Sequence, residues 1–173
     1  GRIRFVKVLL LSPYPERLWD TISSQDEIVE WNDKITLEKA LIMGAEFIVC
    51  FGYCYLLGPD IVQSFRGRAV NLHISFLPYN RSAHPNFWSF VEDTPKGVTI
   101  HQIDEGADSG NIICQKQRHL ERKMTFRETY EILIDEIVAL FRENWESIRN
   151  GSCEPFPQLG EGTFHSDQDI EPY

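Results

Sequence analysis

The sequence has little that suits a membrane or a nucleic acid. No apolar run approaches the roughly 20 residues that a membrane-spanning helix requires. The 17 Lys and Arg residues are outnumbered by 26 Asp and Glu residues, which gives a formal net charge of −9. The basic residues do not cluster, and an acidic surface repels phosphate backbones. We therefore expect neither a membrane nor a nucleic acid among the partners.

Cysteine is scarce, and its spacing suits neither a zinc site nor a redox pair. The four cysteines, Cys50, Cys54, Cys114 and Cys153, form no CxxC pair and have no companion histidines at zinc-type spacing. Residues 1–4 lack the charged and then apolar layout of a signal peptide. We therefore expect reduced thiols, no metal and a cytoplasmic location.

Strand-like and helix-like segments alternate along the first half of the chain. The length of 173 residues fits one domain. The alternation predicts an α/β fold, with a Rossmann-like, mostly parallel sheet and helices on both faces. The expected strands are 3–11, 27–30, 46–51, 69–74, 97–103 and 111–117, and the expected helices are 16–22, 37–43 and 59–65.

The last part of the chain is expected to be one long helix and a tail. Thr125 and Glu128 have the spacing of a capping box, and the apolar residues that follow recur with a helical period. Residues 151–173 are rich in Gly, Pro and acidic residues, so we expect a surface tail within a single domain spanning 1–173.

Asn71 and His73 are the first candidates for chemistry. They end a predicted strand, where open α/β sheets place their ligands, and residues two apart on a strand point the same way. An amide donor can stabilise an oxyanion while an imidazole, which changes charge near neutral pH, handles a proton. Taken alone, the pair also fits a strand end with two polar residues.

The residues that follow make this pair more specific. The chain reads NLHISFLP and later GVTIHQIDEGADSGNII, with Asp108 placed 108 − 73 = 35 residues after His73. In this order and spacing the sequence resembles the folate-dependent formyltransferases, which act on glycinamide ribonucleotide, methionyl-tRNA or amino sugars. The resemblance is good over residues 45–117 and looser elsewhere.

The resemblance implies a catalytic trio of Asn71, His73 and Asp108. An acceptor amine would attack the formyl carbon of N10-formyltetrahydrofolate, with Asn71 on the developing oxyanion, His73 on the proton and Asp108 orienting the imidazole. It also implies that folate, as co-substrate, is bound by Tyr53, Cys54, Tyr55, Leu56, Leu57, Ile103, Asp104, Glu105 and Gly106. No metal is required.

Residues 78–88 resemble the acceptor loop of the branch that formylates nucleotide-linked amino sugars. A GTFH segment at 162–165 also matches the end of that branch's catalytic domain. The resemblance implies acceptor contacts from Arg81, His84, Asn86 and Trp88, with Arg81 near phosphates and Trp88 near a hexose. It implies a substrate such as dTDP-4-amino-4,6-dideoxyhexose and a role in O-antigen or lipopolysaccharide biosynthesis. Trp88 also fits a helix core residue.

Two departures from the family pattern affect these expectations. Ser82 stands where relatives carry Gly, which alone tolerates a positive φ without cost. The part before the Asn-x-His strand is shorter than in relatives, so the fold is expected to be shortened at the N-terminus.

Other functions stay open. These are formylation of glycinamide ribonucleotide, formylation of methionyl-tRNA, which the charge of −9 opposes, and a folate- or nucleotide-binding regulator of low activity. A homodimer is left open, and His101 is expected to be an ordinary strand residue.

Overall fold

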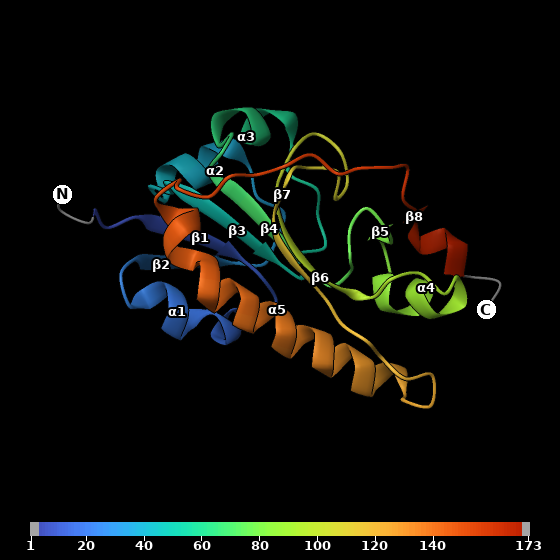
Figure 1. Ribbon diagram of the computed structural model, residues 1–173. Helices are drawn as coiled ribbons and strands as arrows, with labels where there is room; N and C mark the ends of the chain where they lie inside the picture. The colour runs from blue at the N-terminus through green and yellow to red at the C-terminus, as the bar shows by residue number, and fades with distance from the viewer. Residues whose placement is uncertain (1–3, 171–173) are drawn as a thin grey trace.

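A six-stranded mixed sheet forms the centre of the protein, seen in a computed structural model that describes residues 4–170 (Figure 1). The strand order is β2-β1-β3-β4-β6-β7. The first four are parallel, and β6 runs antiparallel to both of its neighbours. The strands are β1 (Lys7–Leu11), β2 (Glu27–Trp31), β3 (Phe47–Phe51), β4 (Ala69–His73), β6 (Gly97–Gln102) and β7 (Ile112–Gln117). The predicted α/β fold with a mostly parallel sheet is confirmed.

Helices cover both faces of this sheet, as the alternating pattern predicts. Successive residues of a strand face opposite sides. Leu10 of β1 therefore packs in the core beneath α1 (Trp19–Ser23) and α5 (Phe126–Arg149), whereas Leu9 and Leu11 pack on the other face. That face is covered by α2 (Leu37–Ile42) and α3 (Pro59–Ser64) (Figure 1). All five residues of β3 are buried because both faces of this strand are covered.

The long helix α5 begins at the predicted capping box. The Thr125 hydroxyl accepts a hydrogen bond from the Glu128 amide, and the Glu128 carboxylate accepts one from the Thr125 amide. Its buried stripe, including Leu133, Ile137 and Phe141, packs against β4, β6 and β7. The helix therefore forms most of one layer of the fold.

Several elements differ from the expectations. Residues 16–22 form a 3-10 turn, η1 (Pro15–Arg17), followed by the short α1. The expected strand 3–11 begins at Lys7, and Ile3 lies outside the described residues. Much of the expected acceptor loop is a helix, α4 (Pro85–Val91), because Pro85 occupies a position where its fixed φ and missing N–H suit helix initiation.

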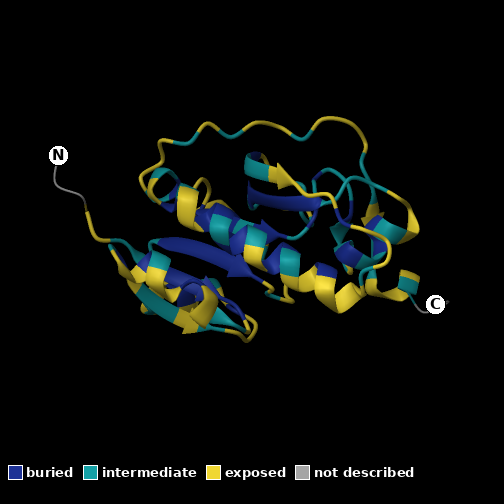
Figure 2. Cartoon of the chain, turned by 60° about the horizontal axis from the view of Figure 1, so that its bottom comes forward, coloured by how far each residue is buried: buried dark blue, intermediate teal, exposed yellow. Residues whose placement is uncertain are grey.

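The tail is a surface segment that pairs with the body of the protein. Figure 2 shows it running along the outside, largely exposed or intermediate. Phe156 forms a bridge to Ile112 of β7, and β8 (Phe164–His165) pairs in parallel with β5 (Arg81–Ser82). A 3-10 turn, η2 (Asp167–Ile170), follows. The tail thus returns from the end of α5 to the loops beyond β4.

Candidate active site

A cleft of about 490 Å³ lies at the carboxyl ends of β3 and β4. This volume falls in the range of small-molecule sites. Its walls come from the segment after β3, the loop after β6, α5, the start of α4 and the tail. The carboxyl ends of parallel strands are where open α/β sheets bind their ligands.

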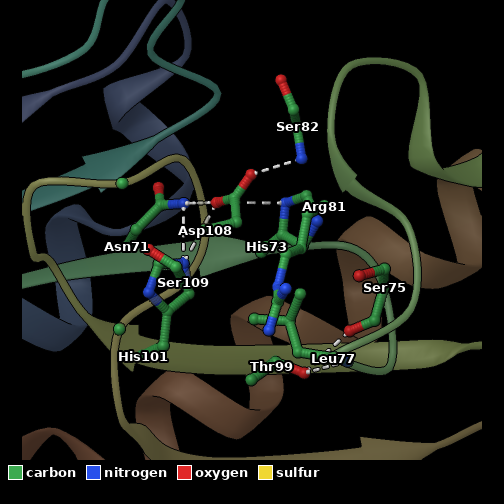
Figure 3. A network of polar contacts seen from close by, with 12 residues as sticks. Asn71, His73, Ser75, Leu77, Arg81, Ser82, Thr99, His101, Asp108 and Ser109 are labelled. Atoms are coloured by element: carbon green, nitrogen blue, oxygen red, sulfur yellow. Dashed lines mark hydrogen bonds and ion pairs between the residues drawn. The ribbon is translucent and has the colours of Figure 1, made fainter. Parts of the chain in front are cut away.

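Asn71, His73 and Asp108 come together in this cleft (Figure 3). Asn71 Nδ2 donates to Asp108 Oδ1 over 2.9 Å, and His73 Nδ1 lies 3.6 Å from the same oxygen. Asn71 and His73 lie two residues apart on β4, so they project from the same face of the strand. The loop after β6 brings Asp108 to them from 37 residues away in the sequence. The structure thus brings together the three residues that the motif spacing selects.

The position of one proton on His73 is fixed by the backbone. His73 Nε2 lies 2.8 Å from the carbonyl oxygen of Asn80, which can only accept a hydrogen bond. Nε2 therefore carries a proton in both charge states of the ring. Nδ1, which faces Asp108, is the nitrogen that gains and loses a proton. A buried histidine with this arrangement is suited to act as a base at Nδ1.

His101 is a second histidine at the same carboxylate, and its role was missed from the sequence. Its Nδ1 lies 2.8 Å from the carbonyl oxygen of Gln102, and its Nε2 lies 3.1 Å from Asp108 Oδ1. The same Nε2 lies 3.2 Å from Asn71 Nδ2, so it faces both the Asp108 carboxylate and the Asn71 amide, while the Gln102 carbonyl, which only accepts, holds a proton on Nδ1. In the sheet His101 pairs with Asn71, and this antiparallel pairing of β4 with β6 gives no signal in the sequence.

These groups keep Asp108 ionised. Burial alone would raise the pKa of this carboxyl group. The charge of His73, the hydrogen bond and charge of His101, and the backbone N–H of Ser82 outweigh burial and hold the pKa of Asp108 well below its usual range. The carboxylate is therefore a fixed negative charge between two imidazole rings.

The backbone around Asp108 adopts unusual conformations. Asp108 has a φ of 53°, in the left-handed region that residues with a Cβ seldom adopt. Ser82, the departure from the family's Gly, has a φ of 70°, and its N–H donates to Asp108 Oδ2 over 2.8 Å. The Gly that the resemblance implies at this position would adopt this conformation without strain. The two strained residues are joined directly by this hydrogen bond.

Most of the expected folate residues line the cleft. Tyr53, Cys54, Tyr55, Leu56, Leu57, Ile103 and Gly106 are all part of its wall. Asp104 and Glu105 are not part of that wall. Asp104 instead accepts hydrogen bonds within the loop from the Gly106 amide and the Ser109 hydroxyl, and Glu105 forms an ion pair with Arg66. These two carboxylates therefore shape the loop and its outer surface.

The expected acceptor residues are not part of the cleft wall. Arg81 donates to the side chain of Gln158 and to the carbonyl of Glu161. Asn86 is buried and donates to α5, at Phe126 O and Thr129 Oγ1. Trp88 is 5% exposed and stacks on His165 with ring centroids 3.9 Å apart, and His84 pairs with Asp167. Three of the four side chains thus contact the tail and Asn86 contacts α5, and none of the four lines the cleft.

Other residues line this half of the cleft, some of them from the segments 78–88 and 162–165 to which the resemblance pointed. Tyr14, Tyr130 and Phe164 contribute aromatic walls, and Ser82, Ala83, Pro85 and Asp167 contribute the remainder. Burial, and a hydrogen bond with Tyr130, raise the pKa of Tyr14, so its hydroxyl stays neutral. No Lys or Arg of the described residues lines the cleft. These side chains come from four separate segments, and no sequence motif pointed to Tyr14 or Tyr130.

A second, larger hollow of about 720 Å³ lies at the amino ends of the strands. Arg68 and Arg149 line it, but they already bind the Glu46 carbonyl and the Asp26 carboxylate. It lies away from the titratable cluster, so the smaller cleft is the candidate site.

None of the helices described here is long and apolar enough to cross a membrane.

Comparison with known proteins gives a consistent set of relatives. The sequence profile described as Formyl transferase matches residues 29–141. The crystal structure of the formyltransferase PseJ from Anoxybacillus kamchatkensis, in complex with UDP-4,6-dideoxy-4-formamido-L-AltNAc and tetrahydrofolate, is 46% identical. The alignment covers 96% of this chain and 89% of that one, with a TM-score of 0.92.

Two curated proteins extend the comparison. The dTDP-4-amino-4,6-dideoxyglucose formyltransferase of Mycobacterium bovis is 36% identical over 104 residues, or 60% of this chain. The methionyl-tRNA formyltransferase of Clostridium botulinum is 29% identical over 136 residues, or 78% of this chain. The matched part spans 44% of the length of each of these curated relatives.

Proposed function

The chain belongs to the formyl transferase family, and from this premise we propose that it moves the formyl group of N10-formyltetrahydrofolate to the amino group of a nucleotide-linked amino sugar. The observation that carries the proposal is the convergence of Asn71, His73 and Asp108, with Asp108 Oδ1 2.9 Å from Asn71 Nδ2 and 3.6 Å from His73 Nδ1. An amide donor, a base and a fixed carboxylate are what transfer of an acyl group to an amine needs.

In this proposal each side chain has one task. His73 accepts the proton of the attacking amine at Nδ1, and Asp108 stabilises the imidazolium that forms. With substrates bound, Asn71 donates an amide N–H to the formyl oxygen, where negative charge develops; without them its Nδ2 lies 2.9 Å from Asp108 Oδ1 and 3.2 Å from His101 Nε2. His73 then returns the proton to the folate nitrogen as its bond to the formyl carbon breaks. The products are the formamide and tetrahydrofolate.

The half of the cleft next to β3 fits a folate. Leu56 and Tyr55 are 71% and 40% exposed, which leaves apolar surface uncovered at the wall where a flat heteroaromatic ring would lie. Burial raises the pKa of Tyr53 to about 12, and its hydroxyl accepts from the Ile35 amide, which fixes the ring. We assign Tyr53, Cys54, Tyr55, Leu56, Leu57, Ile103 and Gly106 to this co-substrate.

The opposite half fits the acceptor. Tyr14, Tyr130 and Phe164 offer faces on which a sugar ring packs. Since no described Lys or Arg lines the cleft, we assign the phosphates of the nucleotide to its open mouth, and Arg81 to the support of the loop. UDP- and dTDP-linked 4-amino sugars are the first candidates, because relatives bind or act on such compounds. A cytoplasmic role in lipopolysaccharide assembly is part of the same proposal.

The acceptor is tested by competition. The protein is incubated with N10-formyltetrahydrofolate and an equimolar mixture of UDP- and dTDP-linked amino sugars, glycinamide ribonucleotide and methionyl-tRNA, and each product is followed by mass spectrometry. We expect one amino-sugar nucleotide to gain a formyl group faster than every other acceptor. Faster formylation of glycinamide ribonucleotide or of the tRNA would contradict the choice of acceptor. No formylation of any acceptor would contradict the transfer itself.

A further inference from the structure

The side chain of Gln158 joins the tail to the loop after β6, which carries Asp108. Its Nε2 donates to the carbonyl oxygens of Asp108 and Gly110, both over 2.8 Å. Its Oε1 accepts from Arg81 Nε over 3.0 Å and from Arg81 Nη2 over 2.7 Å. Gln158 therefore bonds to the residue that carries the catalytic carboxylate, yet it does not line the cleft.

The orientation of this amide is fixed by its partners. Its two N–H donors face two carbonyls, which only accept, and its oxygen faces a guanidinium, which only donates. A flipped amide would place an oxygen against two oxygens and an N–H against two N–H groups. Only one orientation of the Gln158 amide therefore satisfies all of its hydrogen bonds. In that orientation the amide fixes the positions of the Asp108 and Gly110 carbonyls relative to the tail.

These contacts belong to a closed ring of hydrogen bonds that includes Asp108. Gln158 holds its carbonyl oxygen, Arg81 holds Gln158, and the amide of Ser82, the residue after Arg81, donates to Asp108 Oδ2. Arg81 and Ser82 also form β5, which pairs with β8 of the tail. Asp108 and Ser82 both have positive φ, so each costs free energy that the surrounding contacts must offset. Together these hydrogen bonds hold Asp108 and Ser82 in the strained conformation in which the Asp108 carboxylate faces His73.

We propose that Gln158 is a positioning residue, which sets the place of the Asp108 carboxylate between His73 and His101 by holding the backbone of the loop. This inference rests on the proposed formyl transfer for its kinetic consequence only, since the geometry of the loop is measurable without turnover. The tail then contributes to the reaction through Gln158, although this residue does not line the cleft.

Two substitutions distinguish the hydrogen bonds that Gln158 makes to the loop from those that it makes to Arg81. Gln158→Glu keeps two acceptor contacts with Arg81, so the tail stays anchored, but it places an oxygen against the carbonyls of Asp108 and Gly110. Gln158→Met removes the hydrogen bonds of both sides without adding charge. Leu159→Gln is the matched control, because the Leu159 side chain is adjacent and 80% exposed.

The readouts are kcat, KM for both substrates, and the ¹⁵N NMR signals of the histidine side chains. We expect kcat to fall about 10- to 100-fold in both Gln158 variants, as for a misplaced catalytic group, with both KM values changed less than threefold. We also expect the His73 and His101 nitrogen signals to shift in both variants. In Leu159→Gln we expect kcat and both histidine signals to match those of the wild type.

The outcomes distinguish this inference from the proposed function. Gln158 variants that transfer formyl groups at the wild-type rate overturn the inference, even when their melting temperature falls. A wild-type protein that transfers no formyl group overturns the proposed function instead, and the histidine signals alone then decide. Unchanged signals of His73 and His101 in both Gln158 variants would show that Gln158 does not position Asp108.

Discussion

At the scale of single residues, the neighbours of each ring decide which histidine is placed to act as a base. The Asn80 carbonyl holds a proton on His73 Nε2 and leaves Nδ1 to face the cleft and Asp108. The Gln102 carbonyl holds a proton on His101 Nδ1, and His101 Nε2 lies 3.1 Å from Asp108 Oδ1 and 3.2 Å from Asn71 Nδ2. The two rings therefore have different tasks, since the second nitrogen of His101 is engaged with Asp108 and Asn71, whereas His73 Nδ1 lies 3.6 Å from Asp108 and is left for the substrate.

Replacing His73 tests this division of tasks. His73→Asn should lower kcat by about 10²–10⁴-fold, the usual contribution of a general acid or base. The KM for folate should change little, because His73 lies on β4 and not in the apolar segment after β3. Steady-state kinetics on folded protein measures both quantities. His119→Asn, on an exposed histidine, is the control, and a His73→Asn variant with the control's kcat would contradict the role of His73.

Asp108 predicts a pH dependence of stability. Its pKa is depressed in the folded protein, so its ion pairs contribute stability that is complete above the unfolded pKa of about 3.9 and is lost as the pH falls through the folded value. We expect the free energy of unfolding of wild type minus that of Asp108→Asn to shrink as the pH falls below about 5, where only the carboxyl groups titrate. Urea titrations at several pH values measure it. A difference that grows as the pH falls below about 5 would show that the pKa of Asp108 is not depressed.

At the scale of elements, the loop after β6 is held by close approach to its neighbours. A Cβ on Gly110 would lie 1.6 Å from the carbonyl oxygen of Gln102, which is backbone and cannot move aside alone. Gly67 differs, because its φ of 77° is left-handed but nothing lies within 4 Å of a Cβ there. Gly110 is required because there is no space for a Cβ, whereas Gly67 is required by its backbone conformation.

The two glycines give a paired prediction. Gly67→Ala should cost about 1–2 kcal/mol of stability, because of its left-handed conformation. It should leave kcat unchanged, because Gly67 precedes β4 and lies at the opposite end of that strand from the cleft. Gly110→Ala should cost about 1–3 kcal/mol and also lower kcat, since the loop that carries Asp108 must shift. Thermal unfolding and kinetics on both variants measure these effects. Equal kcat values for the two variants would contradict a tight loop.

The elements also show what the sequence can predict. The sheet, both helical layers and the α5 capping box follow from apolar periodicity and cap residues, which are local. Asn71 and His73 were singled out because they share a strand, whereas Asp108 joined them only through the resemblance to the formyltransferases. Arg81 was expected to face a phosphate, but its partner Gln158 lies 77 residues away, and such a long-range pairing has no local signal. For the same reason the antiparallel pairing of β4 with β6, which brings His101 to Asn71, was not expected.

At the scale of the whole molecule, the chain runs away from the cleft and returns to it. The helix α5 begins beside the cleft and ends at the far side of the sheet, and the tail comes back along the surface to β5 (Figure 1). Phe164 and Asp167 thereby join the same cleft wall as Tyr14, which follows β1. The acceptor half thus combines both ends of the described chain with residues after β4 and on α5, whereas the folate half comes from segments near the middle.

The central claim is that this cleft transfers a formyl group to an amine. It is tested most directly with N10-[¹³C]formyltetrahydrofolate and the preferred amino-sugar nucleotide, with enzyme in excess for a single turnover, followed by ¹³C NMR. The account predicts that the label moves to the amine nitrogen of the acceptor as a formamide in the wild-type protein, and at least about 10²-fold more slowly in His73→Asn. Label released as free formate, or label that stays on the folate in the wild type, would contradict it.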